Sequence, residues 1–319
     1  MKEKTFKIIH DSLQQALCDP QTKTLLDALE NFREILNSSV EHVPEEDIPT
    51  FYRFIDGLRA SYYYRWKQSE FSNFMRNQAI ALAYIIAWFN ETISRNYYDE
   101  EASADISVRL KSAMSDWRKI LDKSIESDLK HQLRYARTIS DLSSTVRDRI
   151  GERIILEVEN TNLLFKLYET ILDILGGHNP KTKKEFIKWY ENRKGITPSS
   201  KRAIRESLEV AYSVSHYKNY VEYPKKNGYK TLQFTMSVQS YSFSGVPGLQ
   251  FEIQLRTKAM DEVAVSGSAS HELYKKAKTV YKVISIDDPT ITLRIKKGLE
   301  DFIPLCHCRV EGTSVEIID

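Results

Sequence analysis

Three polar side chains that could take part in chemistry recur at every second position of one short segment. They are Glu252, Gln254 and Arg256, and they alternate with the apolar residues Phe251, Ile253 and Leu255. Successive side chains of a β-strand point to opposite faces of a sheet, so this spacing predicts a strand with one polar face. A carboxylate on that face could hold a divalent cation, and a guanidinium group could bind a phosphate.

A basic turn precedes a second strand of the same kind. Residues 224–229 read Pro-Lys-Lys-Asn-Gly-Tyr, and apolar residues alternate with polar ones from Leu232 to Val238. Cations and an aromatic ring beside an acidic strand suit a nucleotide, because its phosphates, its base and a metal ion would each find a partner. An ordinary hairpin with solvated lysines explains the same pattern, so both interpretations stay open.

The composition is that of a globular protein with room for one large or two ordinary domains. Of 319 residues, 41% are hydrophobic and 28% charged, and the net charge of +2 is too small for wrapping nucleic acid, so phosphate binding must come from local clusters. Three cysteines make no disulfide framework and fit a reducing cytoplasm. Cys306-His307-Cys308 is interpreted as part of a strand, and the longest apolar run, Ala79 to Phe89, as a buried helix rather than a membrane span.

Periodicity divides the chain into three segments. We expect an all-helical region at 1–128, an α/β domain at 129–280 and an α/β tail of unknown role at 281–319. The fold class is therefore α+β, with a mixed sheet flanked by helices and preceded by an all-α region. The expected helices include 24–36, 48–65, 72–95, 106–122, 162–175, 181–193, 199–214 and 259–278, and a strand is expected at 146–156. Aromatic residues between Phe51 and Phe89 are interpreted as core, with a docking face for a partner or RNA as the alternative.

Three motifs, in order, resemble the synthetase domain of the RelA/SpoT alarmone synthetase family. They are Asp148-Arg-Ile-Gly-Glu-Arg153, the segment YVEYPKKNGYKTLQ from Tyr220, and FEIQLRTKAMDEVAVSGSASHELYKK from Phe251. The resemblance covers about residues 129–278. It implies a sheet similar to that of nucleotidyltransferases, and an enzyme that transfers pyrophosphate from ATP to the 3′-hydroxyl of GDP or GTP, giving (p)ppGpp and AMP.

The resemblance also implies roles for individual residues. Asp148 and Glu252 would hold Mg²⁺, and Glu252 would accept the proton of the attacking hydroxyl. Tyr229 would stack on the guanine. The other acceptor-binding residues would be Lys225, Lys226, Asn227, Gln233, Gln254 and Arg256, and the ATP-binding residues would be Arg134, Arg137 and Arg153.

The chain departs from the family pattern at three places, one of which is Ala264-Val265-Ser266-Gly267 where the family has Ala-Glu-x-Gly. The family's ATP-binding helix reads Arg-x-Lys-x-x-x-Ser-x-x-x-Lys, and aligning it on Arg134 leaves both lysine positions without a lysine. The family's histidine after the basic turn is Gln233 here, and glutamine can donate a hydrogen bond to phosphate but carries no charge.

Three functions therefore stay open. The first is an alarmone synthetase acting on GDP or GTP. The second is a related transferase that modifies the 3′ end of tRNA, with the basic, aromatic helices as an RNA site. The third is a non-catalytic nucleotide sensor. The expected partners are ATP and a guanine nucleotide, with tRNA, a second copy of the chain or an antitoxin as further candidates and no membrane.

Overall fold

The computed structural model describes residues 3–21, 25–49, 51–52, 68–94, 101–110, 148, 150–238, 250–265 and 303–318. The chain forms two compact units. One comprises residues 1–68, 111–146 and 283–302, and the other comprises 69–110, 147–282 and 303–319. The three-segment division drawn from the sequence stays a prediction.

The described part of the first unit is helical. Helix α1 (Glu3–Cys18) packs against α2 (Leu25–Ser38), and two short 3-10 helices follow at Val40–His42 and Glu45–Asp47. Phe32 and Leu36 are buried, and the Thr5 hydroxyl donates a hydrogen bond of 2.6 Å to Asp47. The predicted helix at 24–36 is confirmed, and α1 lies in the region expected to be helical.

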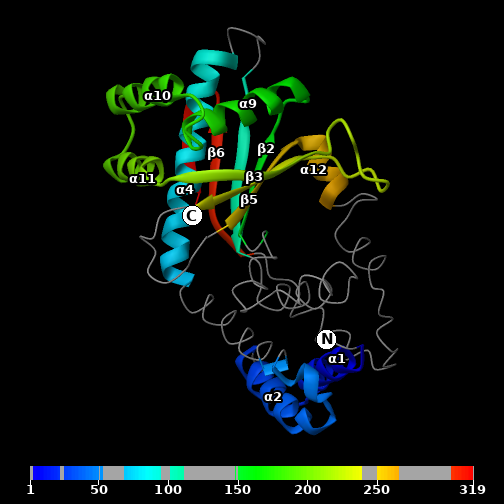
Figure 1. Cartoon of the computed structure of the whole chain (residues 1–319). Coiled ribbons are helices and arrows are strands. Elements are labelled where there is room, and N and C mark those ends of the chain that lie inside the picture. Colours follow the sequence, from blue (N-terminus) through cyan, green and yellow to red (C-terminus); the bar gives the residue numbers. More distant parts are fainter. Residues whose placement is uncertain are drawn as a thin grey trace. The chain divides into compact units, whose positions relative to one another are not determined.

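The second unit contains a seven-stranded mixed sheet (Figure 1). Its order is β3-β4-β5-β2-β1-β6-β7, and β2 and β5 are parallel while the other neighbours are antiparallel. The predicted α+β fold with a mixed sheet is confirmed. The strands are β1 (Ala104–Leu110), β2 (Ile150–Leu156), β3 (Tyr212–Asn219), β4 (Leu232–Val238), β5 (Gln250–Thr257), β6 (Ile303–Glu311) and β7 (Ser314–Ile318).

Helices cover the apolar face of this sheet. Phe74 of α4 packs on Phe251 of β5 with ring centroids 6.2 Å apart, and Tyr168 of α9 packs on Phe234 of β4 at 5.0 Å. α10 and α11 lie on the outer side of α4 (Figure 1). The helices are α4 (Gln68–Phe89), which continues as a π-helix η3 (Asn90–Ser94), α9 (Thr161–Ile174), α10 (Pro180–Asn192), α11 (Pro198–Glu209) and α12 (Lys258–Val265).

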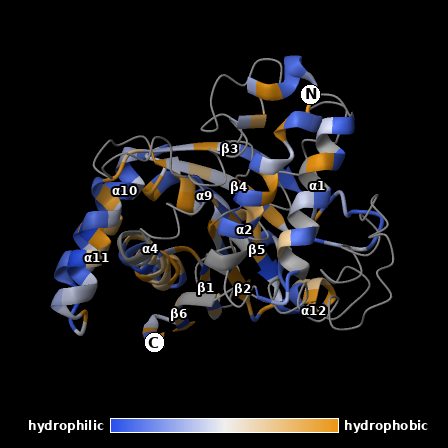
Figure 2. Cartoon of the chain, turned by 90° about the horizontal axis from the view of Figure 1, so that it is seen from below, coloured by the Kyte–Doolittle hydropathy of each residue, from blue (hydrophilic) through white to orange (hydrophobic). Residues whose placement is uncertain are grey.

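Helix α4 is buried along most of its length. Every residue from Ala79 to Phe89 is buried, which confirms the predicted buried helix, and Figure 2 shows α4 as largely hydrophobic and α11 as largely hydrophilic. Phe74, Tyr84 and Trp88 belong to this core, so these aromatic residues form no docking face. Among the described helices, none is long and apolar enough to cross a membrane.

Most of β1 and the first residues of β3 were predicted as helix. β1 stands where a helix over 106–122 was expected, because Ile106 and Leu110 also satisfy helical spacing. The buried residues of β1 are Ala104, Ile106 and Val108, which alternate with half-buried ones and show the period of two. α11 ends at Glu209 and β3 starts at Tyr212, so the expected helix over 199–214 was too long.

Strand β6 contains the Cys-His-Cys segment, as predicted. Cys306 and Cys308 are buried on the apolar face, and His307 lies on the opposite face, where its Nε2 is 3.3 Å from Asp105 of β1. The alternation of the strand therefore separates the histidine from the two thiols.

Candidate active site

The polar face of the sheet brings together residues from four adjacent strands. Glu252 of β5 lies opposite Gly151 of β2, and Gln254 lies between Arg153 of β2 and Gln233 of β4. Because residues in register point to the same side, the polar alternation predicted from the sequence becomes one continuous surface.

Two amides hold the Glu252 carboxylate. Gln233 Nε2 donates to one carboxylate oxygen, and Gln254 Nε2 donates to the other over 2.5 Å. These two hydrogen bonds fix the orientation of the carboxylate, and because Glu252 is only half-buried, it keeps access to solvent. Gln233 occupies the position of the family's histidine. Its amide orients the Glu252 carboxylate and carries no charge.

Arg256 is the most connected residue of this face. Its Nη2 donates to the Tyr229 hydroxyl and to Gln254 Oε1, each over 2.7 Å, and its Nη1 donates to Asp261 Oδ1 over 2.7 Å. The Arg256 side chain is only 4% exposed. A buried guanidinium with three partners is rigid, and it links the basic turn to the strand that carries Glu252.

The basic turn presents an aromatic ring among cations. Lys225 N donates to Tyr229 O over 3.1 Å, and Gly228 adopts φ 80°, a conformation that glycine tolerates best. The Lys225 ammonium lies 4.6 Å from the centre of the Tyr229 ring, and the Arg256 guanidinium lies 5.1 Å from it. The side chain of Asn227 accepts a hydrogen bond from Tyr229 N over 3.3 Å, while Lys226 is exposed.

Three guanidinium groups gather near one carboxylate. Arg153 Nη1 lies 3.5 Å from Asp261 Oδ1, the atom that also binds Arg256. Burial, with repulsion from Arg256 and Arg109, lowers the pKa of Arg153 to about 10. Burial likewise lowers the pKa of Arg109 of β1, which Asp261 raises and Arg256 lowers further. Such a positive cluster attracts a polyanion such as a triphosphate.

Asp148 and Glu252 lie at the same end of two parallel strands. Asp148 forms part of a turn just before β2, and Glu252 is the third residue of β5. A Cβ atom built on Gly151, beside Glu252, would meet no described atom within 4 Å. Carboxylates suit Mg²⁺, which uses one or two of them and keeps water or phosphate oxygens as its other ligands.

Most of the predicted site residues therefore lie together on one face. Arg134 and Arg137 lie outside the described residues. Sequence reasoning missed Arg109 and Asp261. A signal for Arg109 was available, because the Arg-x-Lys-x-x-x-Ser-x-x-x-Lys pattern fits the chain at every position when it starts at Arg109. The matching residues are Arg109, Lys111, Ser115 and Lys119.

The opposite face carries a different acid, Glu152 of β2. It is 1% exposed, and neither carboxylate oxygen has a hydrogen-bond partner among the described residues. Burial, with a smaller effect from Cys306, raises its pKa to about 8. Glu152 is therefore protonated at neutral pH and belongs to the core under the helices.

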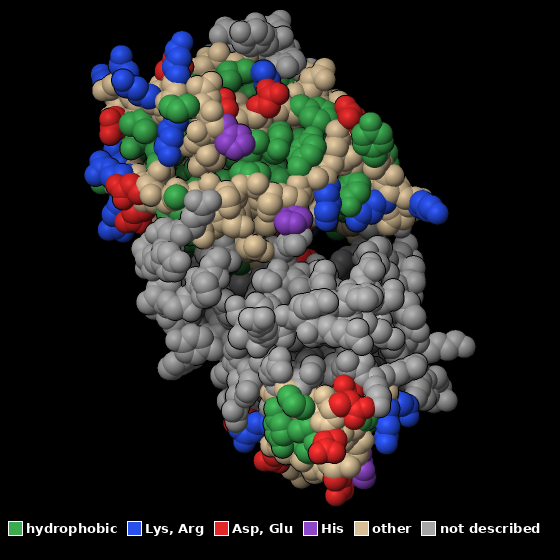
Figure 3. Space-filling model, viewed as in Figure 1, with side chains coloured by type: hydrophobic (Ala, Val, Ile, Leu, Met, Phe, Trp, Pro, Cys, Tyr) green, Lys and Arg blue, Asp and Glu red, His purple; other side chains and the backbone are tan. Residues whose placement is uncertain are grey.

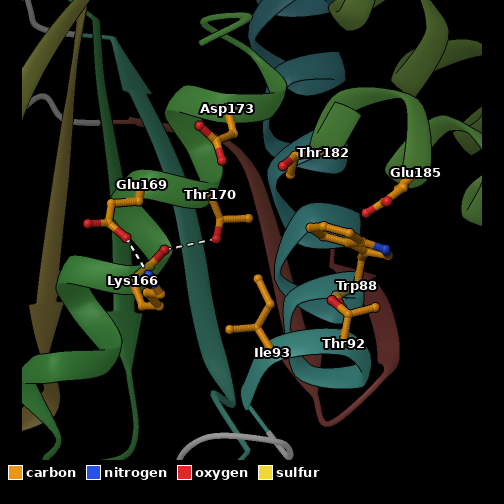
Figure 4. A pocket seen from close by; sticks show the side chains of 9 residues that line it. All are labelled: Trp88, Thr92, Ile93, Lys166, Glu169, Thr170, Asp173, Thr182 and Glu185. Carbon is orange, nitrogen blue, oxygen red and sulfur yellow. Dashed lines mark hydrogen bonds and ion pairs between the residues drawn. The ribbon is translucent and has the colours of Figure 1, made fainter. Parts of the chain in front are cut away.

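A cavity of about 320 Å³ lies between α4 with η3, α9 and α10 (Figure 4). Glu169, Asp173 and Glu185 line it, together with the Trp88 ring. Lys166 also lines the cavity, but its ammonium pairs with Glu169 at 2.7 Å. Since acidic walls repel phosphates, this cavity does not suit a nucleotide.

Lysines and arginines also gather over α10 and α11 (Figure 3). Two of them join the helices: Lys183 Nζ donates to the Leu208 carbonyl over 3.0 Å, and Lys201 Nζ donates to the Glu191 carbonyl over 2.9 Å. Both carbonyls lie near helix C-termini, where cations are stabilising. These two lysines therefore stabilise the packing of α10 and α11.

Known proteins resemble the chain over the region that forms this face. Residues 108–279 match a family described as a region found in RelA / SpoT proteins, so the match begins earlier than the resemblance at about residue 129. A stretch of 58 residues is 50% identical to the chloroplastic GTP diphosphokinase CRSH1 of Oryza sativa subsp. japonica, which is 18% of this chain and 9% of the rice protein.

A longer match is weaker. Over 224 residues the chain is 22% identical to a guanosine-3′,5′-bis(diphosphate) 3′-pyrophosphohydrolase of Haemophilus influenzae, covering 62% of this chain and 29% of the relative. The chain thus spans less than a third of the length of these two curated relatives. Among solved structures, the small alarmone synthetase 1 of Bacillus subtilis bound to its product pppGpp is 18% identical, with a TM-score of 0.37, covering 73% of this chain and 90% of that one.

Proposed function

The chain belongs to the RelA/SpoT family, and on that basis we propose that it transfers pyrophosphate from ATP to the ribose 3′-hydroxyl of GDP or GTP, giving AMP and (p)ppGpp. The observation that supports this best is the shared face on which Glu252, Tyr229 and Arg153 lie within one hydrogen-bonded and ion-paired network. A carboxylate, a ring flanked by cations and a buried guanidinium suit proton removal, base stacking and ATP binding respectively.

In this reaction Glu252 accepts the proton of the 3′-hydroxyl while that oxygen attacks the β-phosphorus of ATP. The bond from this phosphorus to the α-phosphate oxygen breaks, and AMP leaves with the oxygen. Gln233 and Gln254 orient the carboxylate, and the arginine cluster stabilises the negative charge on the phosphates. Positioning and charge neutralisation account for most catalysis in reactions of this class.

Asp148 and Glu252 would hold Mg²⁺, which would neutralise the ATP phosphates. An ionised carboxylate has about four lone-pair sites, so the two amide hydrogen bonds leave Glu252 able to bind the ion. For the acceptor, Tyr229 would stack on the guanine. The phosphates and ribose of the acceptor nucleotide would be bound by Lys225, Lys226, Asn227, Gln254 and Arg256.

For ATP we propose Arg109 in place of Arg134 as the arginine that faces Arg153 across the adenine. Arg109 is half-buried, and it is close enough to Arg153 to lower its pKa. With this alignment Lys111 and Lys119 occupy the two lysine positions of the family's pattern, and Arg137 is not needed there. The argument for a non-catalytic sensor, which depended on missing lysines, then loses its support.

The acceptor decides between the two enzymatic functions. Purified protein would be incubated with γ-labelled ATP and GDP, GTP or bulk tRNA, and the products separated by thin-layer chromatography, with Glu252→Gln as control. We expect label in a guanine nucleotide and none with the variant. Label in tRNA alone would support the tRNA-modifying function, and ATP binding without transfer to any acceptor would support the sensor. Association with a second copy or an antitoxin stays a separate proposal.

A further inference from the structure

Asp261 lies behind the polar face, in the first turn of α12 directly after β5. Its side chain is 16% exposed, and Oδ1 is 2.7 Å from Arg256 Nη1 and 3.5 Å from Arg153 Nη1. A negative charge is favoured in the first turn of a helix, and here the carboxylate also faces two guanidinium groups.

From Asp261 a chain of hydrogen bonds leads to Glu252. Arg256 can only donate, so the atom of Gln254 that faces it is the oxygen, at 2.7 Å. The amide nitrogen of Gln254 then necessarily faces Glu252, which it meets at 2.5 Å. The same Arg256 nitrogen also donates to the Tyr229 hydroxyl. The position of Arg256 thus fixes both the carboxylate and the ring.

Asp261 also offsets repulsion within the arginine cluster. Arg256 lowers the pKa of both Arg109 and Arg153, whereas Asp261 raises both. Without this carboxylate, three guanidinium groups on neighbouring strands would repel one another. Arg256, the most buried of the contacts to Asp261, would lose the partner that holds Nη1.

We propose that Asp261 is a positioning residue for pyrophosphate transfer: it holds Arg256 in the orientation that aligns Gln254 and Tyr229, and through them the Glu252 carboxylate and the acceptor base. This inference rests on the function proposed above. Asp261 itself touches neither nucleotide. Its negative charge keeps the arginine cluster ordered and lowers the net positive charge of the cluster by one unit.

Asp261 favours catalysis because it aligns Arg256, but its negative charge reduces the attraction of the arginine cluster for ATP. Asp261→Asn separates these two effects. The amide offers Arg256 only a neutral acceptor, which holds it more weakly than a carboxylate does, and it removes the charge that offsets repulsion within the arginine cluster. We expect kcat to fall about 10- to 100-fold and KM for GDP to rise a few-fold, while the Kd for ATP, measured by calorimetry, stays the same or decreases. Melting temperatures of variant and parent should agree within a few degrees. The exposed neighbour Glu262→Gln is the matched control and should change each quantity less than twofold.

Asp261→Glu keeps the charge and displaces it by one methylene, so kcat should recover part of the loss with ATP affinity close to that of the parent. Unchanged kcat in Asp261→Asn would overturn the inference. Parallel losses of kcat, ATP affinity and melting temperature would also overturn it, because they would show a structural role only. A parent protein that transfers label to no acceptor would overturn the proposed function and this inference together. An active parent with an unaffected Asp261→Asn variant would overturn this inference alone.

Discussion

Two glutamates on adjacent strands show how differently the two faces of the sheet treat the same side chain. Glu252 of β5 faces the polar side, is half-buried and accepts hydrogen bonds from two amides. Glu152 of β2 lies opposite Ile253 on the apolar side and has no hydrogen-bond partner among the described residues. The alternation of a strand decides which face a residue meets, and the face decides whether its carboxyl group can hold a charge.

The largest expected effect is on catalysis, and it should be confined to one of the two glutamates. Glu252→Gln should lower pyrophosphate transfer about 100- to 10,000-fold, because the proton acceptor is lost. Glu152→Gln should keep activity within about twofold, because a neutral acid is replaced by a neutral amide of similar shape. Initial rates measured by label transfer test both, and equal losses in the two variants would break the comparison.

A second prediction concerns stability. The pKa of Glu152 is raised from its ordinary value to about 8, so between about pH 4.5 and 8 the folded protein holds a proton that the unfolded chain has released. The contribution of Glu152 to the free energy of unfolding should therefore be fully present below about pH 4.5 and fall by roughly 3 to 5 kcal/mol as the pH rises from there to above 8.

Urea denaturation at pH 5, 7 and 9 measures this slope, with Glu152→Gln as the reference that lacks it. The titratable groups that interact electrostatically with Glu152 include Cys306 and Tyr212, and burial raises the pKa of Tyr212 as well, so Tyr212 adds no charge over this pH range. The same slope in parent and variant would show that Glu152 is not the group responsible.

The third prediction identifies the arginine that belongs to the polar face. Arg109→Ala should lower kcat/KM for ATP about 10- to 100-fold, because the cluster loses one of its guanidinium groups. Arg134→Ala should change it less than twofold. Rates at varied ATP concentration would decide, and the reverse order of effects would restore the alignment on Arg134.

The smallest effect is expected at Gln233. Gln233→His would place a titratable group beside Glu252. Protonation of the imidazole below about pH 6.5 would pair it with the carboxylate and weaken the base, so the rate should fall a few-fold from pH 8 to pH 6. The rate of the parent should change less over this range. A variant with the parent's pH profile would show that the side chain at position 233 does not contact Glu252.

The strands of the site could be predicted from the sequence because their alternation is local. β5 and β4 carry unbroken apolar sets on one side, and the motif around Asp148 marked the start of β2. β1 was missed because the spacing of Ile106 and Leu110 fits both a helix and a strand. Arg109 was missed with it because it lies in β1. The pairing of β1 between β2 and β6 depends on contacts far apart in the chain, which no local pattern encodes.

The pairing of β1 with β6 has a consequence for the order in which the protein is made. Asp105 of β1 and His307 of β6 are 202 residues apart. At roughly 5 to 20 residues per second, a ribosome adds β6 about 10 to 40 seconds after β1. During that interval β1 has an unpaired edge that can bind a strand of another chain. Slow translation between these strands should therefore favour aggregation of nascent chains, and a chaperone that shields β1 should increase the yield of folded protein.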